Sequence, residues 1–371
     1  MEIIRSKRPG GADPARERTV LLGALLHDIG HGPFSHAFEH AVKKRTHVDW
    51  GAQIVAEDTS VTRILADVDP ALPREIAQLL REEQPKDIYA SIVSSQFDAD
   101  RLDYLRRDRL MTGVEFAHLD IEWIFDCLEV GTVTLGDVND PVEEPCLFLN
   151  PKGVQVAEEY LEARFRLYMM VYMHKTTRSA EKMLERLLER LREVAADDAG
   201  LRDRSRLAGF IATDSPMLDD YLALDDTVVW AELHTLSQSS DPIIQTLAKR
   251  LTNRELYKCF DLGAVVGERD EGNRRHRFMR SVRQKQAEGR FPDLLVDDTQ
   301  VTGYKWYDFE STNALEKVLV KRDQHDPEPR DIAEFSTVVK SLIERAKIYR
   351  LYLPDEAEVD QIEQLYRETA R

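Results

Sequence analysis

The stretch His27-Asp28-Ile29-Gly30-His31-Gly32-Pro33-Phe34-Ser35-His36 decides the fold of this chain. It follows an apolar run, Val20 to Leu26, that predicts a helix ending at the His-Asp pair. Imidazole beside carboxylate is a ligand pair that suits iron, manganese or a similar divalent ion. Five of the ten histidines lie between His27 and His47. The crowding predicts a metal site, although for any one imidazole, and specifically for His40, a helix cap or a pairing with a local acid is the favoured explanation.

A second stretch, Phe97-Asp98-Ala99-Asp100-Arg101-Leu102-Asp103-Tyr104-Leu105-Arg106-Arg107-Asp108, predicts a helix that is dense in carboxylates and guanidinium groups. Residues four apart share a helix face, so Asp100, Tyr104 and Asp108 form one row. Mixed charges on a helix ordinarily form a solvated face of salt bridges. The leucines and the tyrosine favour partial burial instead, and a buried carboxylate needs a metal or an arginine.

Residues 154–196 predict one long helix or two nearly continuous helices. On such a helix Arg164, Tyr168, Tyr172 and Lys175 fall within about 80° of one another. The two cations suit a polyphosphate, and the two rings suit a nucleobase. The same stripe is also expected of a packed helix whose cationic side chains reach solvent at their tips.

Composition limits the class of protein. The chain has 371 residues, a formal net charge of -17 and 42% hydrophobic residues, which is typical of a globular protein. Its overall charge repels nucleic acid, so a polyanion would have to bind a local basic site. No apolar run approaches the roughly 20 residues that cross a bilayer, and no secretory signal precedes Val20. With only three cysteines, we expect a cytoplasmic protein with reduced thiols and no membrane span.

The remaining patterns predict a mainly α fold. Residues 130–149 are rich in β-branched residues, glycine and proline and predict a β-hairpin inserted among the helices. Ser35 is expected to cap the helix that follows the first motif. We expect a helical core over residues 1–260 and a smaller mixed α/β region over residues 261–371. In the latter part the patterns predict strands at 262–266 and 301–309 and a helix at 332–348.

The first stretch resembles the signature of the HD-domain phosphohydrolases, specifically their deoxynucleoside triphosphate triphosphohydrolase (dGTPase-like) branch. Residues 97–108 resemble that branch's segment with the last metal aspartate, and Tyr172-Met173-His174-Lys175 resembles its nucleotide-binding stretch. Residues 219–258 are similar to its later helices, and residues 336–349 to its C-terminal helix. The resemblance covers residues 20–260 and implies an HD-domain helical core.

The resemblance also implies a role for each matched residue. The ligands of the divalent ion would be His27, Asp28 and Asp100. These donor types favour manganese, iron or magnesium. The acid beside the leaving oxygen would be His36, whose imidazole Glu39 can orient from three residues away. His47 and His31 belong to the same catalytic shell. The substrate contacts would be Arg101, Tyr104, Arg164, Tyr172 and Lys175.

The implied reaction converts a deoxynucleoside triphosphate to a deoxynucleoside and inorganic triphosphate. The implied assembly is a homo-oligomer that can also take an allosteric nucleotide. One feature departs from the pattern, because that branch carries an earlier ligand histidine in an Arg-Phe-Glu-His-like sequence, whereas the first histidine here is His27. Either Met1 falls inside the helix that should bear this ligand, which the breaker-rich opening favours, or the chain has lost it and binds metal weakly.

A second hypothesis is a catalytically impaired module of the same fold that senses nucleotides or binds nucleic acid. It draws on the missing histidine and on the cationic segment 269–290. A solvated helix or a subunit contact explains the same segment, and the net negative charge favours that explanation.

Overall fold

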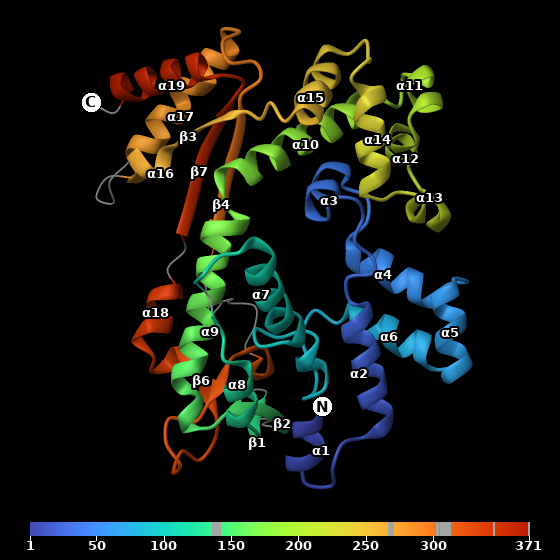
Figure 1. The fold of residues 1–371 in the computed structure, drawn as a ribbon, viewed down its shortest axis with the longest axis vertical. Helices are drawn as coiled ribbons and strands as arrows, with labels where there is room; N and C mark the ends of the chain where they lie inside the picture. Colours follow the sequence, from blue (N-terminus) through green and yellow to red (C-terminus); the bar gives the residue numbers. More distant parts are fainter. Residues whose placement is uncertain are drawn as a thin grey trace. The chain divides into compact units, whose positions relative to one another are not determined.

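The computed structural model describes residues 1–116, 118–135, 142–265, 271–301, 304, 313–343 and 346–369. These residues form mainly α-helices with small sheets (Figure 1), which confirms the predicted fold class. The chain divides into two compact units. The first unit holds residues 1–30, 47–171 and 302–345, and the second holds residues 31–46, 172–301 and 346–371. The boundary expected at residue 260 stays a prediction, because compact units need not coincide with domains along the chain.

The N-terminal helices of the first unit form a small bundle. They are α1 (Glu2–Lys7), α2 (Pro14–Leu26), α4 (His47–Ala56), α5 (Ser60–Val68) and α6 (Leu72–Arg81). Asp13 caps α2, since its carboxylate accepts the Ala15 N–H at 2.9 Å. The apolar faces of α4, α5 and α6 bury Val55, Leu65 and Ile76 together. This packing fixes the C-terminal end of α2, where the His-Asp pair begins.

The rest of the first unit combines helices with the predicted hairpin. Its elements are the 3-10 turn Ala90–Ile92, α7 (Ala99–Thr112), α8 (Ile121–Cys127), β1 (Leu128–Leu135), β2 (Val142–Leu149), α9 (Val154–Leu167), β5 (Leu319–Val320), β6 (Arg330–Asp331) and α18 (Thr337–Ile343). Strands β1 and β2 pair antiparallel from Leu128 opposite Leu149 to Leu135 opposite Val142. The hairpin is therefore confirmed, and β5 and β6 extend it to a sheet in the order β1-β2-β5-β6.

Helices of the second unit gather around α10 (Lys175–Val194). They are α3 (His36–Val42), α11 (Ala199–Arg204), α12 (Arg206–Ala212), α13 (Leu218–Leu222), α14 (Asp226–Leu236) and α15 (Pro242–Asn253). The helical stretch predicted over 154–196 is two helices, because a π-helical turn at Tyr168–Tyr172 follows α9 and α10 begins afresh at Lys175. His174 caps α10 by accepting the Thr176 N–H at Nδ1, at 3.3 Å.

A three-stranded antiparallel sheet completes the second unit. Its order is β3 (Lys258–Asp261), β7 (Ala346–Leu353) and β4 (Leu295–Val301). Helices α17 (Glu271–Ala287) and α19 (Glu356–Thr369) lie beside it (Figure 1). Phe260, Phe278, Leu351 and Tyr366 are buried together between these helices and the sheet. The core of this unit is thus closed by elements far apart in sequence.

Three predictions for the later part of the chain need correction or lie outside the description. The strand predicted at 262–266 is wrong, because Leu262–Val265 is the short helix α16 and the strand precedes it. The helix predicted at 332–348 is wrong at its end, because α18 stops at Ile343 and residues 346–353 form the central strand β7. Of the strand predicted at 301–309, Val301 ends β4, and residues 302–303 and 305–309 lie outside the described residues.

Candidate metal centre and its surroundings

The end of α2 and the first turn of α7 bring three potential metal ligands together in the first unit. His27 is the C-cap residue of α2, Asp28 follows it, and Asp100 lies in the first turn of α7. His27 Nε2 lies 3.3 Å from Asp28 Oδ2 and 3.5 Å from Asp100 Oδ1. One ligand atom from each of the three residues lies within 4.8 Å of the other two. Residues 72 positions apart in the chain therefore converge as the two sequence patterns predict.

The imidazole of His27 has the orientation that a metal ligand needs. Its Nδ1 lies 2.9 Å from Ala24 O, which fixes the ring and leaves Nε2 facing the two carboxylates. Nε2 is buried and makes no hydrogen bond with the described residues. The Asp100 carboxylate, together with the Asp28 charge and against the effect of burial, raises the pKa of His27 to about 9. A buried nitrogen that faces two carboxylates without a hydrogen bond to either fits a divalent cation.

Gly30 holds the segment after the His-Asp pair against α4 within the same unit. A Cβ at Gly30 would lie 2.0 Å from His47 O and 2.2 Å from Gly51 N. These contacts are with backbone atoms, which cannot move aside as a side chain can. The close approach therefore requires glycine, and it fixes where the chain leaves Asp28.

A partly buried cationic and aromatic cluster is formed by α7, after Asp100, and by the end of α9 in the first unit. Arg164 on α9 is 8% exposed, and its Nη1 makes no hydrogen bond with the described residues. Its guanidinium carbon lies 5.8 Å from the centre of the Tyr168 ring. Burial raises the pKa of Tyr104 to about 12, although the charges of Arg164 and Arg101 act in the opposite direction. The structure thus places Arg101, Tyr104 and Arg164 around α7, whereas Tyr172 belongs to the second unit.

The later histidines of the motif form a cluster of their own in the second unit. The rings of His31 and His36 meet edge to face with centroids 5.1 Å apart. One ligand atom each of His31, His36 and Glu39 lies within 4.8 Å of the others. His40 stacks on His36 with centroids 6.0 Å apart. His47, expected in the same shell, is the first residue of α4 in the first unit.

The turn between His31 and His36 differs from the expectation in one respect. Ser35 does not cap α3 with its side chain; its hydroxyl lies 3.1 Å from His31 Nδ1 instead. Phe34 and Ser35 both have positive φ angles, 56° and 53°, which cost of order 1–3 kcal/mol each for residues other than glycine. The Phe34 N–H donates to Asp226 Oδ1 at 2.8 Å. This anchor, invisible in the motif itself, helps to hold the strained turn that carries both histidines.

Comparison with protein families agrees with this geometry. Residues 4–108 match the model of the HD domain, and residues 141–290 match the model of the HD associated region. The chain carries an HD domain. The matched segment contains every residue of the metal centre, from His27 to Asp100.

Several known proteins resemble this HD-domain chain. Over 262 residues it is 32% identical to an uncharacterized protein of Bacillus subtilis, YwfO, covering 68% of this chain and 55% of that protein. A deoxynucleoside triphosphate triphosphohydrolase SAMHD1 homolog of Dictyostelium discoideum is 24% identical over 262 residues, covering 66% of this chain and 44% of that protein. The chain thus spans about half the length of these curated relatives.

Solved structures extend the likeness at the level of the fold. A phosphohydrolase from Bacteroides thetaiotaomicron superposes with a TM-score of 0.68 and 24% identity, covering 95% of this chain and 83% of that one. A hypothetical protein from Aquifex aeolicus superposes with a TM-score of 0.64 and 22% identity, covering 95% of this chain and 79% of that one. At these identities the comparison shows a shared fold.

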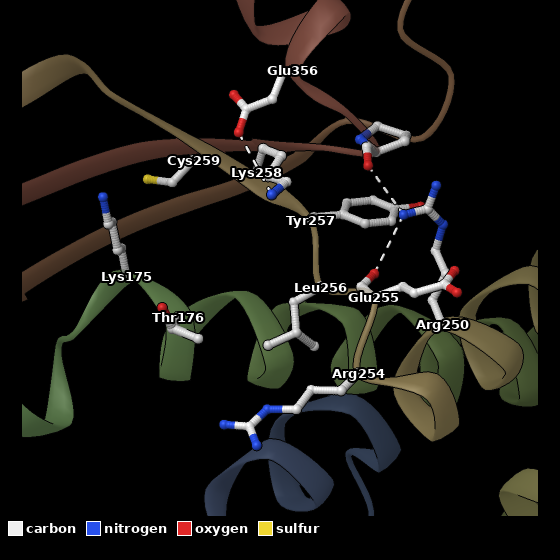
Figure 2. Close-up of a pocket in the computed structure, with 11 residues that line it drawn as sticks. Lys175, Thr176, Arg250, Arg254, Glu255, Leu256, Tyr257, Lys258, Cys259 and Glu356 are labelled. Carbon is white, nitrogen blue, oxygen red and sulfur yellow. Dashed lines mark hydrogen bonds and ion pairs between the residues drawn. The ribbon is translucent and has the colours of Figure 1, made fainter.

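The HD-associated region contains most of a basic pocket in the second unit (Figure 2). Its cavity of about 740 Å³ is lined by Lys175, Thr176, Arg250, Arg254, Glu255, Leu256, Tyr257, Lys258, Cys259, Pro354 and Glu356. Arg250 is tied down, since it donates to Pro354 O at 3.0 Å and packs on the Tyr257 ring at 5.2 Å. Lys258 lies 3.5 Å from Glu356, whereas Lys175 and Arg254 have no charged partner among the described residues.

Sequence reasoning found Lys175 but missed the arginines that surround this pocket. Arg250, Arg254 and Lys258 recur every four residues across the end of α15 and the following strand. Arg254 itself has a left-handed backbone, with φ 58°. This spacing of four residues indicates a shared helix face for Arg250 and Arg254. The helix ends at Arg254, so helical periodicity alone does not place Lys258 beside the two arginines.

Within the described residues, the chain has no helix long and apolar enough to traverse a lipid bilayer.

Proposed function

We propose that this HD-domain chain is a metal-dependent phosphohydrolase that converts deoxynucleoside triphosphates to deoxynucleosides and inorganic triphosphate. The observation that carries the proposal is a convergence in the first unit. The three potential ligands His27, Asp28 and Asp100 lie together, and Arg101 follows Asp100 in the first turn of α7. Helix α7 packs against α9, which carries the buried Arg164, and Arg164 Nη1 has no hydrogen-bond partner among the described residues. An unsatisfied buried donor beside a metal centre suits a phosphate oxygen.

The ion that His27, Asp28 and Asp100 would hold is manganese, iron or magnesium by the chemistry of the donors. When bound, such an ion supplies Lewis acidity toward water and phosphate. Arg101 and Arg164 neutralise charge on the triphosphate, and Tyr104 borders the same site. Zinc in a closed structural site would favour four sulfur or nitrogen donors, which these residues do not offer.

The proton that the leaving group needs is assigned to the second cluster of the motif. Water adds to the α-phosphorus, the bond from that phosphorus to the sugar oxygen breaks, and His36 protonates the departing oxygen. Glu39 orients the imidazole of His36, and His31 and His47 belong to the same relay. Tyr172 and Lys175 are assigned to the substrate by resemblance. These catalytic and binding roles are part of the proposal.

The direct test is product analysis with the purified protein. Each deoxynucleoside triphosphate is incubated with Mn²⁺, Fe²⁺ or Mg²⁺, the nucleoside is quantified by chromatography, and the phosphate product is identified by ³¹P NMR. We expect free deoxynucleoside and intact triphosphate in equal amounts. Asp100→Asn is expected to remove both metal binding and turnover, whereas Asp103→Asn, an exposed carboxylate on the same helix, leaves both unchanged.

The products discriminate between reaction classes. Release of orthophosphate or pyrophosphate would make the chain a phosphohydrolase of a different bond. Absence of any product, with Mn²⁺ bound and the protein folded, would contradict the enzymatic proposal.

Regulation of the same activity is proposed for the basic pocket of the second unit. Arg254, which has no charged partner among the described residues, and the Tyr257 ring suit a second, allosteric nucleotide. Arg254→Glu is expected to abolish activation by a non-substrate nucleotide without removing basal turnover. The homo-oligomer that accompanies such regulation is tested by light scattering with and without that nucleotide.

A different function is favoured by one observation on α17. Its exposed Arg277, Arg280 and Arg283 have no ion pair with the described residues, although the chain as a whole carries a charge of -17. We infer that, if the chain does not hydrolyse nucleotides, this helix binds the phosphates of a single-stranded nucleic acid. Binding should then weaken steeply with salt, and replacing the three arginines by glutamine should remove that salt dependence.

A further inference from the structure

The first turn of α7 carries Asp100 and Arg101 in succession, and both follow the buried Asp98. The side chain of Asp98 is 3% exposed. We propose that Asp98 is a positioning residue, which sets the metal ligand Asp100 through the helix cap and the phosphate-binding Arg101 through an ion pair. The inference rests on the proposed function of the metal centre.

The cap fixes the first turn of α7. Asp98 is the N-cap residue, with φ −86° and ψ 171°, and its Oδ1 accepts the Arg101 N–H at 2.8 Å. The first N–H groups of a helix lack partners within the helix, so an acceptor at this position prevents the turn from fraying. Asp100 lies inside this turn. The 3.5 Å distance from Asp100 Oδ1 to His27 Nε2 therefore depends on the cap.

The second carboxylate oxygen of Asp98 holds the Arg101 side chain. Arg101 Nη1 donates to Asp98 Oδ2 and also to Ser95 O. The other N–H groups of the guanidinium make no hydrogen bond with the described residues, and the side chain is 29% exposed. One edge of the planar fork is thus fixed on Asp98, and the opposite edge remains to bind phosphate oxygens.

The segment before Asp98 is itself held in place within the first unit. Tyr160 donates its hydroxyl hydrogen to Gln96 O at 2.7 Å, and the Gln96 N–H donates to Glu316 O at 2.8 Å. The Phe97 ring meets the Tyr160 ring edge to face at 5.1 Å. Asp98 therefore enters the helix from an anchored chain, and its carboxylate transmits that placement to Asp100 and Arg101.

The same helix offers a matched control. Asp103 and Arg107 form an i, i+4 ion pair whose side chains are 66% and 59% exposed. Asp103 is not the cap of α7, and among the described residues its carboxylate pairs with Arg107 and not with Arg101. Losing this pair should change neither metal binding nor catalysis, because exposed pairs contribute little.

The experiment separates the two functions of Asp98. Mn²⁺ affinity is measured by calorimetry, and KM and kcat are measured on the hydrolysed nucleotide, for Asp98→Asn, Asp98→Ala and Asp103→Asn. Asp98→Asn keeps an oxygen for the cap, so we expect the Kd for Mn²⁺ within about 2-fold of wild type and KM about 10-fold higher. Asp98→Ala should also weaken Mn²⁺ binding, by about 10-fold. Asp103→Asn should change neither quantity.

Two results would overturn the proposal: an unchanged KM in Asp98→Asn, or wild-type Mn²⁺ affinity in Asp98→Ala. If Asp98→Ala does not fold, Asp98→Ser, which restores a cap acceptor without the ion pair, takes its place and should behave as Asp98→Asn. If the wild type hydrolyses no nucleotide, the proposed function fails on its own. The Mn²⁺ titrations and equilibrium binding of a non-hydrolysable deoxynucleotide analogue to the same variants then decide the role of Asp98.

Discussion

A single backbone position decides where the histidine motif leaves the metal centre. Gly30 lies so close to α4 that a side chain there would meet backbone atoms of His47 and Gly51 at 2.0 and 2.2 Å. The sequence predicted that the helix ends at the His-Asp pair, but it did not predict why the next turn needs a glycine. Two segments of backbone touch there, and only the folded unit brings them together.

Gly30→Ala should therefore destabilise the protein strongly. Overpacking of this kind typically costs about 1–3 kcal/mol, and a clash with backbone on both sides belongs at the upper end. Gly209→Ala is the matched control, because its nearest atom is 3.8 Å away and alanine in a helix is favoured over glycine by about 0.5–1 kcal/mol. Denaturant unfolding of the two variants measures both effects. Equal stability of the two would contradict the role given to Gly30.

Under the proposed function Arg164 is the opposite case, a residue that substrate binding needs and that stability does not. Its Nη1 is buried without a hydrogen-bond partner among the described residues, which costs free energy in the folded state. Arg164→Met should leave the free energy of unfolding no lower than that of wild type. It should lower kcat/KM about 10- to 100-fold, because a charge-assisted hydrogen bond contributes about 1.5–3 kcal/mol. A variant that loses stability and keeps activity would reverse this assignment.

Residue types and their spacing predicted much of the candidate site, but they did not predict the residues that hold it in place. His27, Asp28 and Asp100 were found because imidazole and carboxylate are recognisable metal donors, and the structure places them together. Their catalytic use stays a prediction. The sequence predicted no role for Asp98, because a capping aspartate looks the same in sequence as an exposed one. The anchor from Asp226 to Phe34 spans 192 residues, a separation that no local pattern encodes.

At the scale of elements, the sequence predicted the helices that have local patterns, but it did not predict the three-stranded sheet of β3, β7 and β4. The hairpin of β1 and β2 was predicted because its two strands are neighbours in sequence. The start of β7, residues 346–348, was predicted as the end of a helix, because the pairing of this strand with β3 and β4 comes from segments more than 40 residues away. Long-range pairing overrides local propensity in such a strand.

One ion pair ties α10 to that sheet within the second unit. Arg178 donates from Nε and Nη2 to the carboxylate of Asp297 at 2.9 and 2.7 Å, and the Asp297 side chain is fully buried. Burial by itself would raise the pKa of Asp297, but the hydrogen bonds from Arg178 and Thr299 outweigh it and lower the pKa below its usual 3.8. The lowered pKa means that ionised Asp297 stabilises the fold.

The sign of the pH dependence follows. Stability from this pair is fully present above pH 3.8, the usual pKa of the unfolded chain, and is lost as pH falls through the lower folded pKa. Arg178→Met should cost about 3–5 kcal/mol at neutral pH, because it leaves a buried charge unpaired. The double variant Arg178→Met with Asp297→Leu should recover a large part of that loss. Urea unfolding between pH 3 and 7 measures the stability of the wild type, the single variant and the double variant. A double variant as unstable as the single one would refute the role given to this ion pair.

At the scale of the whole molecule, charge acts in two directions. The chain carries a net charge of -17, so its own carboxylates repel one another and also repel an anionic substrate. Under the proposed function, attraction for a nucleotide must come from the few cations placed at the site, above all Arg101 and Arg164. Salt screens both the repulsion over the surface and the attraction at the site.

Raising NaCl from about 50 to 300 mM shortens the Debye length from about 14 to 6 Å, and it should therefore change stability and substrate binding oppositely. The melting temperature should rise, since self-repulsion is relieved, whereas KM for a deoxynucleoside triphosphate should increase, because exposed parts of Arg101 lose their attraction for phosphate. Sucrose as an uncharged additive should raise the melting temperature without increasing KM in this way. A melting temperature that falls with salt would show that surface ion pairs outweigh the net repulsion. A KM that falls with salt would show that repulsion by the whole chain, and not attraction at the site, governs how the nucleotide arrives.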